Sequence, residues 1–241
     1  YGRPMSARRP LREQLRLPLT RAASHGATAF VRSASNAYAV DALAAWPDST
    51  GQVMAICGPA GCGKSHLAAL WAERVGAIPL NGAEAALADP LELEGRPVLL
   101  DIAQDADDET LFHLINLAQH DGGALLMVSR PSPRRWHVAV PDLRSRLDAV
   151  RVVAMEAPDD TVLSAILTAR FAEHSITPGD GVIDYLVRRI DRSAAAVADV
   201  VDRLDAEHRP VTRTLARQVL EASDDLFDDA PEDDGGSGLQ P

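Results

Sequence analysis

The sequence contains no long apolar run and only two cysteines. No stretch approaches the roughly 18 consecutive apolar residues of a membrane span, and the arginine-rich start lacks the apolar segment of a signal peptide. Cys57 and Cys62 have neither the spacing of a disulfide framework nor that of a metal site. This cysteine usage is typical of a reducing compartment. We therefore expect a cytoplasmic protein that makes no contact with a membrane.

Basic residues are absent from the end of the chain. Residues 221–241 hold eight acids and no Lys or Arg, and without those eight charges the net charge of −11 becomes −3. This composition predicts a disordered acidic tail over 223–241. A weakly acidic body is a poor partner for the backbone of duplex DNA, so we expect any contact with DNA to be indirect. The first 22 residues differ, with six arginines and one acid, and we interpret them as a flexible arm.

Short apolar runs and helical patterns alternate in the first two thirds of the chain. The runs lack polar alternation, as expected for strands that are covered on both faces, and they lie at 53–57, 78–80, 97–101, 124–129 and 150–155. Between them, residues 64–76 and 109–123 each place apolar side chains on one helical face. This order predicts an α/β fold with a parallel, doubly wound sheet.

Strand patterns stop after about residue 156. Four amphipathic helical stretches follow, at 157–175, 181–190, 193–208 and 212–222. We therefore predict four parts of the chain: the arm (1–22), an α/β nucleotide-binding domain (23–156), a small all-helical lid domain (157–222) and the acidic tail (223–241).

A phosphate-binding loop is predicted between the first strand and the first long helix. Residues 58–65, GPAGCGKS, fit the pattern G-x-x-x-x-G-K-[ST]. Glycines let such a loop turn its backbone N–H groups inward, and the helix N-terminus adds partial positive charge. Lys64 is then expected at the β- and γ-phosphates and Ser65 at Mg²⁺. The alternative is a glycine-rich turn that only joins strand to helix. The predicted nucleotide-binding residues of the loop are Gly58, Pro59, Ala60, Gly61, Cys62, Gly63, Lys64 and Ser65.

Asp101 is the predicted second metal ligand. It ends the apolar run 97–101, where P-loop proteins usually carry an acid for the magnesium ion. The alternative is an aspartate that simply ends a strand in solvent. ATPases of the AAA+ type generally place a second acid next to polarise the attacking water, and here that position is Ile102. We therefore expect at most a weak intrinsic ATPase activity. Asp105, Asp107 and Asp108 are candidates to substitute for the missing second acid, and the alternative is that they only form an acidic loop.

Several ordered motifs together resemble the DnaA initiator family, and in particular its shortened regulatory members of the Hda type (HdaA in some lineages). GPAGCGKSHLAAL resembles the family's Walker A segment, and FVRSASNAYAVDAL (30–43) resembles its adenine-side segment. LLMVSRPSPRRW resembles the sensor 1 strand, PDLRSRL (141–147) the arginine-finger segment, and RIDRSAAAV the sensor 2 turn. The resemblance covers roughly residues 11–222. It implies an AAA+ P-loop NTPase whose nucleotide, ADP or ATP with Mg²⁺, also contacts Asn36, His66, Ser129 and Arg192.

The same resemblance assigns Arg146 as an arginine finger that acts in trans on a partner's ATP. Arg144 is the weaker candidate, and the alternative for either residue is a solvated position on a helix. From the resemblance we expect no counterpart of the initiator's C-terminal DNA-binding domain, because an acidic tail follows the last predicted helix instead.

The arm contains a peptide that resembles a sliding-clamp-binding motif. In QLRLPL, Gln14 would hydrogen-bond in the clamp pocket, while Leu15, Leu17 and Leu19 are buried and Pro18 keeps the segment extended. The alternative is an arm that packs on its own domain.

These features predict a negative regulator of replication initiation. Such an adaptor binds the polymerase sliding clamp (the beta subunit) and stimulates hydrolysis of the ATP bound to DnaA, with DnaA or a second copy of the chain as its AAA+ neighbour. The first alternative is a DnaA-like helicase loader or motor with its own ATPase activity. A small-molecule P-loop kinase and a non-replicative adaptor are the others.

Overall fold

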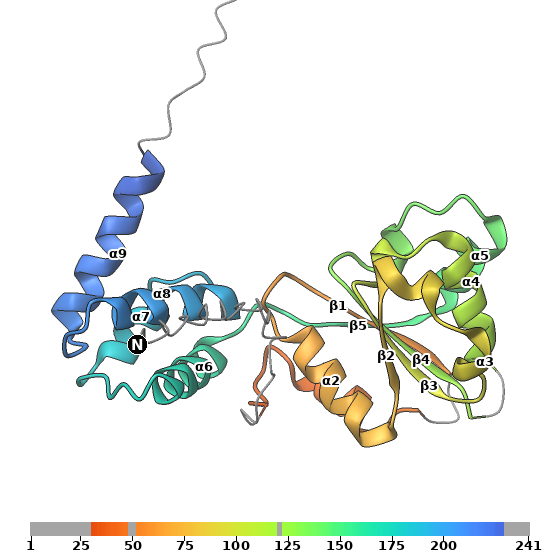
Figure 1. Cartoon of the computed structure of the whole chain (residues 1–241), viewed down its shortest axis with the longest axis horizontal. Coiled ribbons are helices and arrows are strands. Elements are labelled where there is room, and N and C mark those ends of the chain that lie inside the picture. Colours follow the sequence, from red (N-terminus) through yellow and green to blue (C-terminus); the bar gives the residue numbers. More distant parts are fainter. Residues whose placement is uncertain (1–29, 48–51, 120–121, 229–241) are drawn as a thin grey trace, which may run out of the picture.

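The computed structural model describes residues 30–47, 52–119 and 122–228. They form an α/β domain, which is followed by a domain of helices (Figure 1). The predicted arm (1–22), with its clamp-binding peptide at 13–19, lies outside the described residues, as does the end of the predicted tail, 229–241. In the described ranges, no helix is long and apolar enough to cross a membrane.

The α/β domain is built on one sheet of five parallel strands. The sheet order is β2-β3-β4-β1-β5, so that β4 lies at the centre between β3 and β1. Every residue of β4 is buried, as expected for a strand covered on both faces. The strands are β1 (Val53–Cys57), β2 (Ile78–Asn81), β3 (Pro97–Asp101), β4 (Ala124–Ser129) and β5 (Arg151–Ala154). The predicted parallel, doubly wound sheet is confirmed.

Helices cover both faces of this sheet. On one face, α1 (Ala37–Ala44) and α2 (Lys64–Val75) bury Leu43, Leu67 and Trp71 in an apolar cluster with the strands. On the other face lie α4 (Asp108–Leu117) and α5 (Pro141–Ala149) (Figure 1). They contribute to a second cluster around Leu111, Leu143 and Leu147. The short helix α3 (Pro90–Leu93) and the 3₁₀ turns η1 (Gly82–Leu87), η2 (Ala103–Asp105) and η3 (Pro133–Arg135) complete the domain.

Local sequence signals determine where several helices begin and end. Gly76 ends α2 in the left-handed conformation, which a glycine adopts without strain. The Asp107 carboxylate accepts a hydrogen bond from the Thr110 backbone N–H and so caps the start of α4. Ser193 caps α8 in the same way through Ala196, as its position in the sequence predicts. Helix α4 stops at Leu117, six residues before the end of its predicted range.

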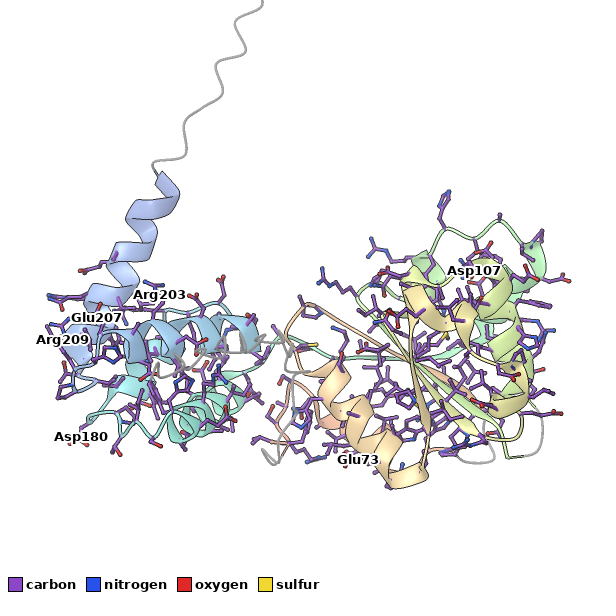
Figure 2. All side chains as sticks on the ribbon, viewed as in Figure 1. Glu73, Asp107, Asp180, Arg203, Glu207 and Arg209 are labelled. Carbon is purple, nitrogen blue, oxygen red and sulfur yellow. The ribbon has the colours of Figure 1, made fainter. Side chains whose placement is uncertain are left out.

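The range predicted as the lid domain, called the lid below, holds α6 (Asp160–Glu173), α7 (Val182–Val187), α8 (Ala194–Ala206) and the start of α9 (Arg213–Asp228). Its core is apolar and includes Leu163, Phe171, Leu186 and Leu204. Arg203 donates a hydrogen bond to the backbone oxygen of Val219 and so links α8 to α9; Figure 2 labels Arg203 there, near Glu207 and Arg209. Helix α9 continues to Asp228, so the helix extends into the range predicted as tail, which began at 223.

Candidate nucleotide site

The predicted phosphate-binding loop connects β1 to α2 and is held between strand and lid. Gly58 has φ 154°, and a Cβ there would collide with the backbone oxygen of Met155, so the position accepts only glycine. Gly61 has φ 71°, and a Cβ there would lie 2.6 Å from the Cβ of Ser193 in the lid. The Gly61 backbone oxygen also accepts a hydrogen bond from the Ala194 N–H, 3.1 Å away. The lid therefore touches the loop directly at the start of α8.

Lys64 is the only lysine of the chain, and its side chain is 8% exposed. Its Nζ donates hydrogen bonds to the backbone oxygens of Gly58 at 3.0 Å and Pro59 at 2.7 Å. The Sγ of Cys62 lies 3.7 Å from the same nitrogen. The ammonium group is thus enclosed by the loop at the N-terminus of α2, where the helix dipole adds positive potential. Such a place favours an anion.

The two predicted metal ligands meet at the edge of the sheet. Ser65 Oγ donates a hydrogen bond to Asp101 Oδ1 across 3.2 Å, although 36 positions separate the residues. A hollow of about 500 Å³ opens beside them, and its lining also includes Lys64 and Ser129. Ser129 is 2% exposed, and its hydroxyl donates to the Pro131 backbone oxygen at 2.7 Å. A hydroxyl and a carboxylate are oxygen donors of the kind that Mg²⁺ prefers, so the donor set fits this ion.

Ile102 occupies the position of the second acid and lines the same hollow. Its side chain is 41% exposed, and its backbone adopts φ 52° and ψ 42°, a conformation that is unusual for a β-branched residue. Of the three candidate substitutes for the missing acid, Asp105 lines the hollow. Asp107 instead caps α4, and Asp108 Oδ2 accepts from the Ala139 N–H at 2.6 Å. Hydrogen bonds from Thr110 hold the pKa of Asp107 below its usual value.

The predicted adenine-side residues form a turn ahead of α1. The Oδ1 of Asn36 accepts from the Ser33 N–H, and its Nδ2 donates to the Val31 oxygen, each across 2.9 Å. These bonds occupy the Asn36 amide within its own turn, so the residue shapes the turn. The rings of Phe30 and His66 pack edge to face with their centroids 5.5 Å apart, which brings this turn next to the first turn of α2.

Arg192 lies on the chain segment that leads into α8. Its guanidinium donates to the Pro158 backbone oxygen at 3.1 Å and pairs with Asp160 Oδ1 at 2.7 Å. In the structure, those bonds fix the start of α6, and the residues that reach the phosphate-binding loop are the adjacent Ser193 and Ala194. The contact of Arg192 with a nucleotide stays a prediction.

The two arginines of α5 have different surroundings. Arg144 donates to the backbone oxygens of Trp136 and Pro133, both at 3.0 Å, and pairs with Asp148. Arg146 is half-buried, and its guanidinium lies over the Phe112 ring, 4.8 Å from the centroid. Among the described residues no carboxylate forms an ion pair with Arg146. The side chain lines a second hollow of about 410 Å³, together with Arg151.

Two residues of these sites escaped sequence analysis. Gln104 lines the nucleotide-side hollow, and Phe112 supports Arg146 from α4. Neither belongs to a recognisable motif, and no signal in the sequence links either one to its site. Within the described part of the chain, no group of three or more His, Cys, Asp or Glu residues could hold a metal ion by itself.

Comparison with known proteins identifies the fold. No protein-family model matches the chain. The structure superimposes on domain III of the replication initiation protein DnaA from Thermotoga maritima with a TM-score of 0.67 and 18% identity, covering 80% of this chain and 94% of that one. The fold is that of the AAA+ domain of DnaA. The structure of AMPPCP-bound DnaA from Aquifex aeolicus is similar too, with a TM-score of 0.62, 17% identity and coverage of 83% and 68%.

Sequence comparison points to the same relationship. The chromosomal replication initiator protein DnaA of Thermomicrobium roseum is 25% identical over 125 residues. That alignment includes 50% of this chain and 27% of the longer protein. The chain thus contains a DnaA-related AAA+ domain, and it spans only about a quarter of this DnaA relative.

Proposed function

We propose that this protein is a cytoplasmic, Hda-type adaptor of replication initiation, which carries its own nucleotide and activates a partner's ATP hydrolysis. It binds the replication sliding clamp through the peptide Gln14–Leu19 and offers Arg146 to the ATP of a neighbouring DnaA subunit. The observation that carries the proposal is the surroundings of Arg146: a guanidinium supported by an aromatic ring, unpaired with any carboxylate of the described residues, and facing a hollow.

The proposal assigns the hollow beside Lys64 to the adaptor's own ADP or ATP. The similar DnaA from Aquifex aeolicus was solved with AMPPCP bound, which supports a nucleotide at the corresponding edge of the sheet. Lys64 would bind the phosphates, and Ser65 and Asp101 would hold Mg²⁺, which neutralises phosphate charge when it is bound. Because Ile102 replaces the acid that polarises water, this nucleotide is turned over slowly and serves mainly to shape the domain.

The role of Arg146 depends on its freedom to reach another subunit. Helix α5 is fixed to the sheet by the buried Leu143 and Leu147, which point inward from the same helix. The cation–π contact with Phe112 orients the guanidinium without neutralising it. An arginine in this state can stabilise the charge that develops on a transferred phosphoryl group.

A reconstituted hydrolysis assay tests the proposal. The assay contains DnaA loaded with labelled ATP, clamp loaded on DNA, and the full chain. We expect Arg146→Ala to lower the stimulated rate by about 10³- to 10⁵-fold, the range known for arginine fingers. The matched control is Arg135→Ala, which removes an exposed arginine from the turn ahead of α5 and should leave stimulation intact. Full stimulation by Arg146→Ala would refute the role, and brisk turnover by the chain alone would favour the motor or helicase loader.

A second assay tests the clamp-binding peptide, whose residues lie outside the described ranges. We expect a joint change of Gln14 and Leu17 to Ala to abolish binding to the isolated clamp, because the hydrogen bond and the apolar burial are both lost. Nucleotide affinity should stay unchanged. If the double variant still binds the clamp like the original chain, the peptide is not the docking element.

A further inference from the structure

The two most exposed large apolar side chains of the described residues lie in one short segment. Leu87 ends η1 and is 86% exposed, and Leu91 lies in α3 and is 79% exposed. Figure 1 shows α3 on the outside of the α/β domain, away from the lid. Single exposed leucines are normal in soluble proteins, but two within five consecutive residues concentrate apolar surface at one place. We call residues 87–91 the leucine patch.

The local fold keeps these two leucines at the surface. Ala85 and Leu93 on either side are each 4% exposed and belong to the second apolar cluster, so η1 and α3 are fixed to the domain by other side chains. Asp89 caps α3 by accepting a hydrogen bond from the Leu91 N–H at 2.9 Å, and Pro90 begins the helix. Substitution of the two exposed leucines should therefore leave the stability of the fold almost unchanged.

The leucine patch lies in acidic surroundings. Residues 82–95 contain four acids and no basic residue. All four are exposed, and none forms an ion pair with a described residue; they are Glu84, Asp89, Glu92 and Glu94. A partner that fits this surface supplies apolar side chains together with positive charge. The backbone of a nucleic acid is negative and does not fit.

The arm of the same chain has the composition that this surface requires, and its residues lie outside the described ranges. Its 22 residues hold six arginines and one acid. Leu15, Leu17 and Leu19 alternate with other residues, and in an extended segment side chains at alternate positions point to the same side. Arg21 continues this alternation, so a segment that lays its leucines on the patch also directs a guanidinium at the acids.

The chain is long enough for the arm to reach the leucine patch. The described residues begin at Phe30, which packs against His66 at the start of α2, the helix that follows the carboxyl end of β1. In this parallel sheet β2 ends at the same edge and continues into η1, three strand spacings or about 14 Å from β1. Leu19 precedes Phe30 by eleven residues, which span up to about 36 Å when extended.

We propose that the arm docks on the leucine patch of its own chain when no clamp is bound, with its three leucines against Leu87 and Leu91. This inference rests on the proposed clamp binding through the same peptide. Docking covers the side chains that the clamp pocket takes, so the arm occupies either the patch or the clamp. The apparent affinity for the clamp is then the intrinsic affinity reduced by the fraction of chains whose arm is free.

Clamp binding measures this fraction. The full chain and the joint variant Leu87→Ser and Leu91→Ser are each titrated with isolated clamp. We expect the variant to bind about 3- to 10-fold more tightly, which corresponds to an arm that is docked in about two thirds to nine tenths of the original chains. The matched control is Val140→Ser, which removes an exposed apolar side chain ahead of α5 and should leave the affinity unchanged. Equal Tm values for all three proteins would show that the folds are intact.

Carbodiimide coupling tests the contact itself, because Lys64 is the only lysine of the chain and is 8% exposed. Arg21→Lys introduces an amine beside the leucines of the arm, and carbodiimide joins an amine to a carboxylate only where the two groups touch. We expect mass spectrometry of the digested full chain to find this amine coupled to the four acids of residues 82–95, and excess clamp to suppress the coupling. Arg134→Lys, at an exposed arginine of η3, is the matched control and should couple to none of them.

The outcomes separate this inference from the proposed function. If the original chain binds the clamp and the leucine variant binds it equally well, docking on the patch is overturned while clamp binding stands. Coupling found only between different chains, in a mixture of isotope-labelled and unlabelled protein, would assign the patch to a second copy and would also overturn the inference. If neither protein binds the clamp, the proposed clamp binding fails, and the inference fails with it.

Discussion

The two cationic sites of the α/β domain, around Lys64 and around Arg146, are built in opposite ways. Lys64 is enclosed by its own loop, bonded to two carbonyl oxygens, and the loop is touched by the lid. Arg146 lies on the outer side of α5 and contacts an aromatic ring. An enclosed cation suits a ligand that the chain keeps, whereas a half-exposed and unneutralised one suits a ligand that another subunit brings. The four predictions below test this difference, beginning with the largest effect.

The first prediction compares neighbours on α5. Leu147 is fully buried, so Leu147→Ala should lower the free energy of unfolding by about 2–5 kcal/mol through the cavity it leaves. Arg146→Ala should change it by no more than about 1 kcal/mol, because the guanidinium is only half-buried. Urea unfolding followed by circular dichroism measures both. If Arg146→Ala were as destabilising as Leu147→Ala, the outward role of Arg146 would be in doubt.

The second prediction concerns the enclosed cation. Lys64→Met removes the positive charge and its hydrogen bonds, so nucleotide should bind about 10- to 150-fold more weakly, as for a lost charge-assisted contact. Arg146→Ala should bind nucleotide normally. Isothermal titration calorimetry with ADP and Mg²⁺ measures the affinity of both variants. An equal loss of affinity in the two would mean that Lys64 and Arg146 serve the same nucleotide.

The third prediction addresses the contact between loop and lid. Gly61→Ala introduces a Cβ that would lie 2.6 Å from Ser193 and places alanine at φ 71°. We expect a loss of about 1–2 kcal/mol in stability, because left-handed backbone strains any residue with a Cβ. The segment between β5 and α6 should also be cleaved faster in limited proteolysis. Gly76→Ala is the matched control, with φ 67° but open space around its Cβ, and unchanged cleavage there would assign the effect to the lid contact.

The smallest expected effect concerns the support of Arg146 from α4. Asp107, labelled in Figure 2, caps the helix that carries Phe112, so Asp107→Ala should cost about 1 kcal/mol of stability. Because the pKa of Asp107 is depressed, its contribution is complete above the ordinary aspartate pKa near 4 and is lost as the pH falls through the lower folded value. Asp107→Asn should retain much of the cap and weaken this acid dependence. The urea midpoints of the original chain and of both variants are measured between pH 2.5 and 7. Equal pH dependence in all three would contradict the role of Asp107.

Sequence patterns predicted the strands and the short motifs, which depend on residues that are adjacent in the chain. The strands were visible because covered strands are uniformly apolar, and Lys64 and Ser65 because one short motif contains both. Asp101 was predicted as a metal ligand from its place at a strand end; in the structure its Oδ1 accepts a hydrogen bond from Ser65 Oγ, and the metal role of both residues stays a prediction. The predicted ends of helices α4 and α9 were less accurate, because the glycines that follow α4 lie five and six residues beyond Leu117, and because the acidic residues taken as a sign of disorder begin inside α9.

The hydrogen-bond partners of individual side chains and the backbone conformation of packed turns could not be predicted from the sequence. Arg192 pairs with Asp160, which lies 32 positions away, and nothing local indicates that choice. Asn36 directs both ends of its amide into its own turn, an arrangement that depends on backbone geometry. The left-handed Ile102 is likewise a property of the packed turn, because isoleucine by itself disfavours that backbone.

One feature of the loop bears on post-translational chemistry. Arginine supplies 23 of the 24 formal cations, so amine-directed reagents and acyl-transferring enzymes find a single side-chain amine in these 241 residues. An acetyl group on that nitrogen would erase its charge and displace it from both carbonyls. Acylation of this amine would therefore remove the positive charge from the predicted phosphate-binding loop.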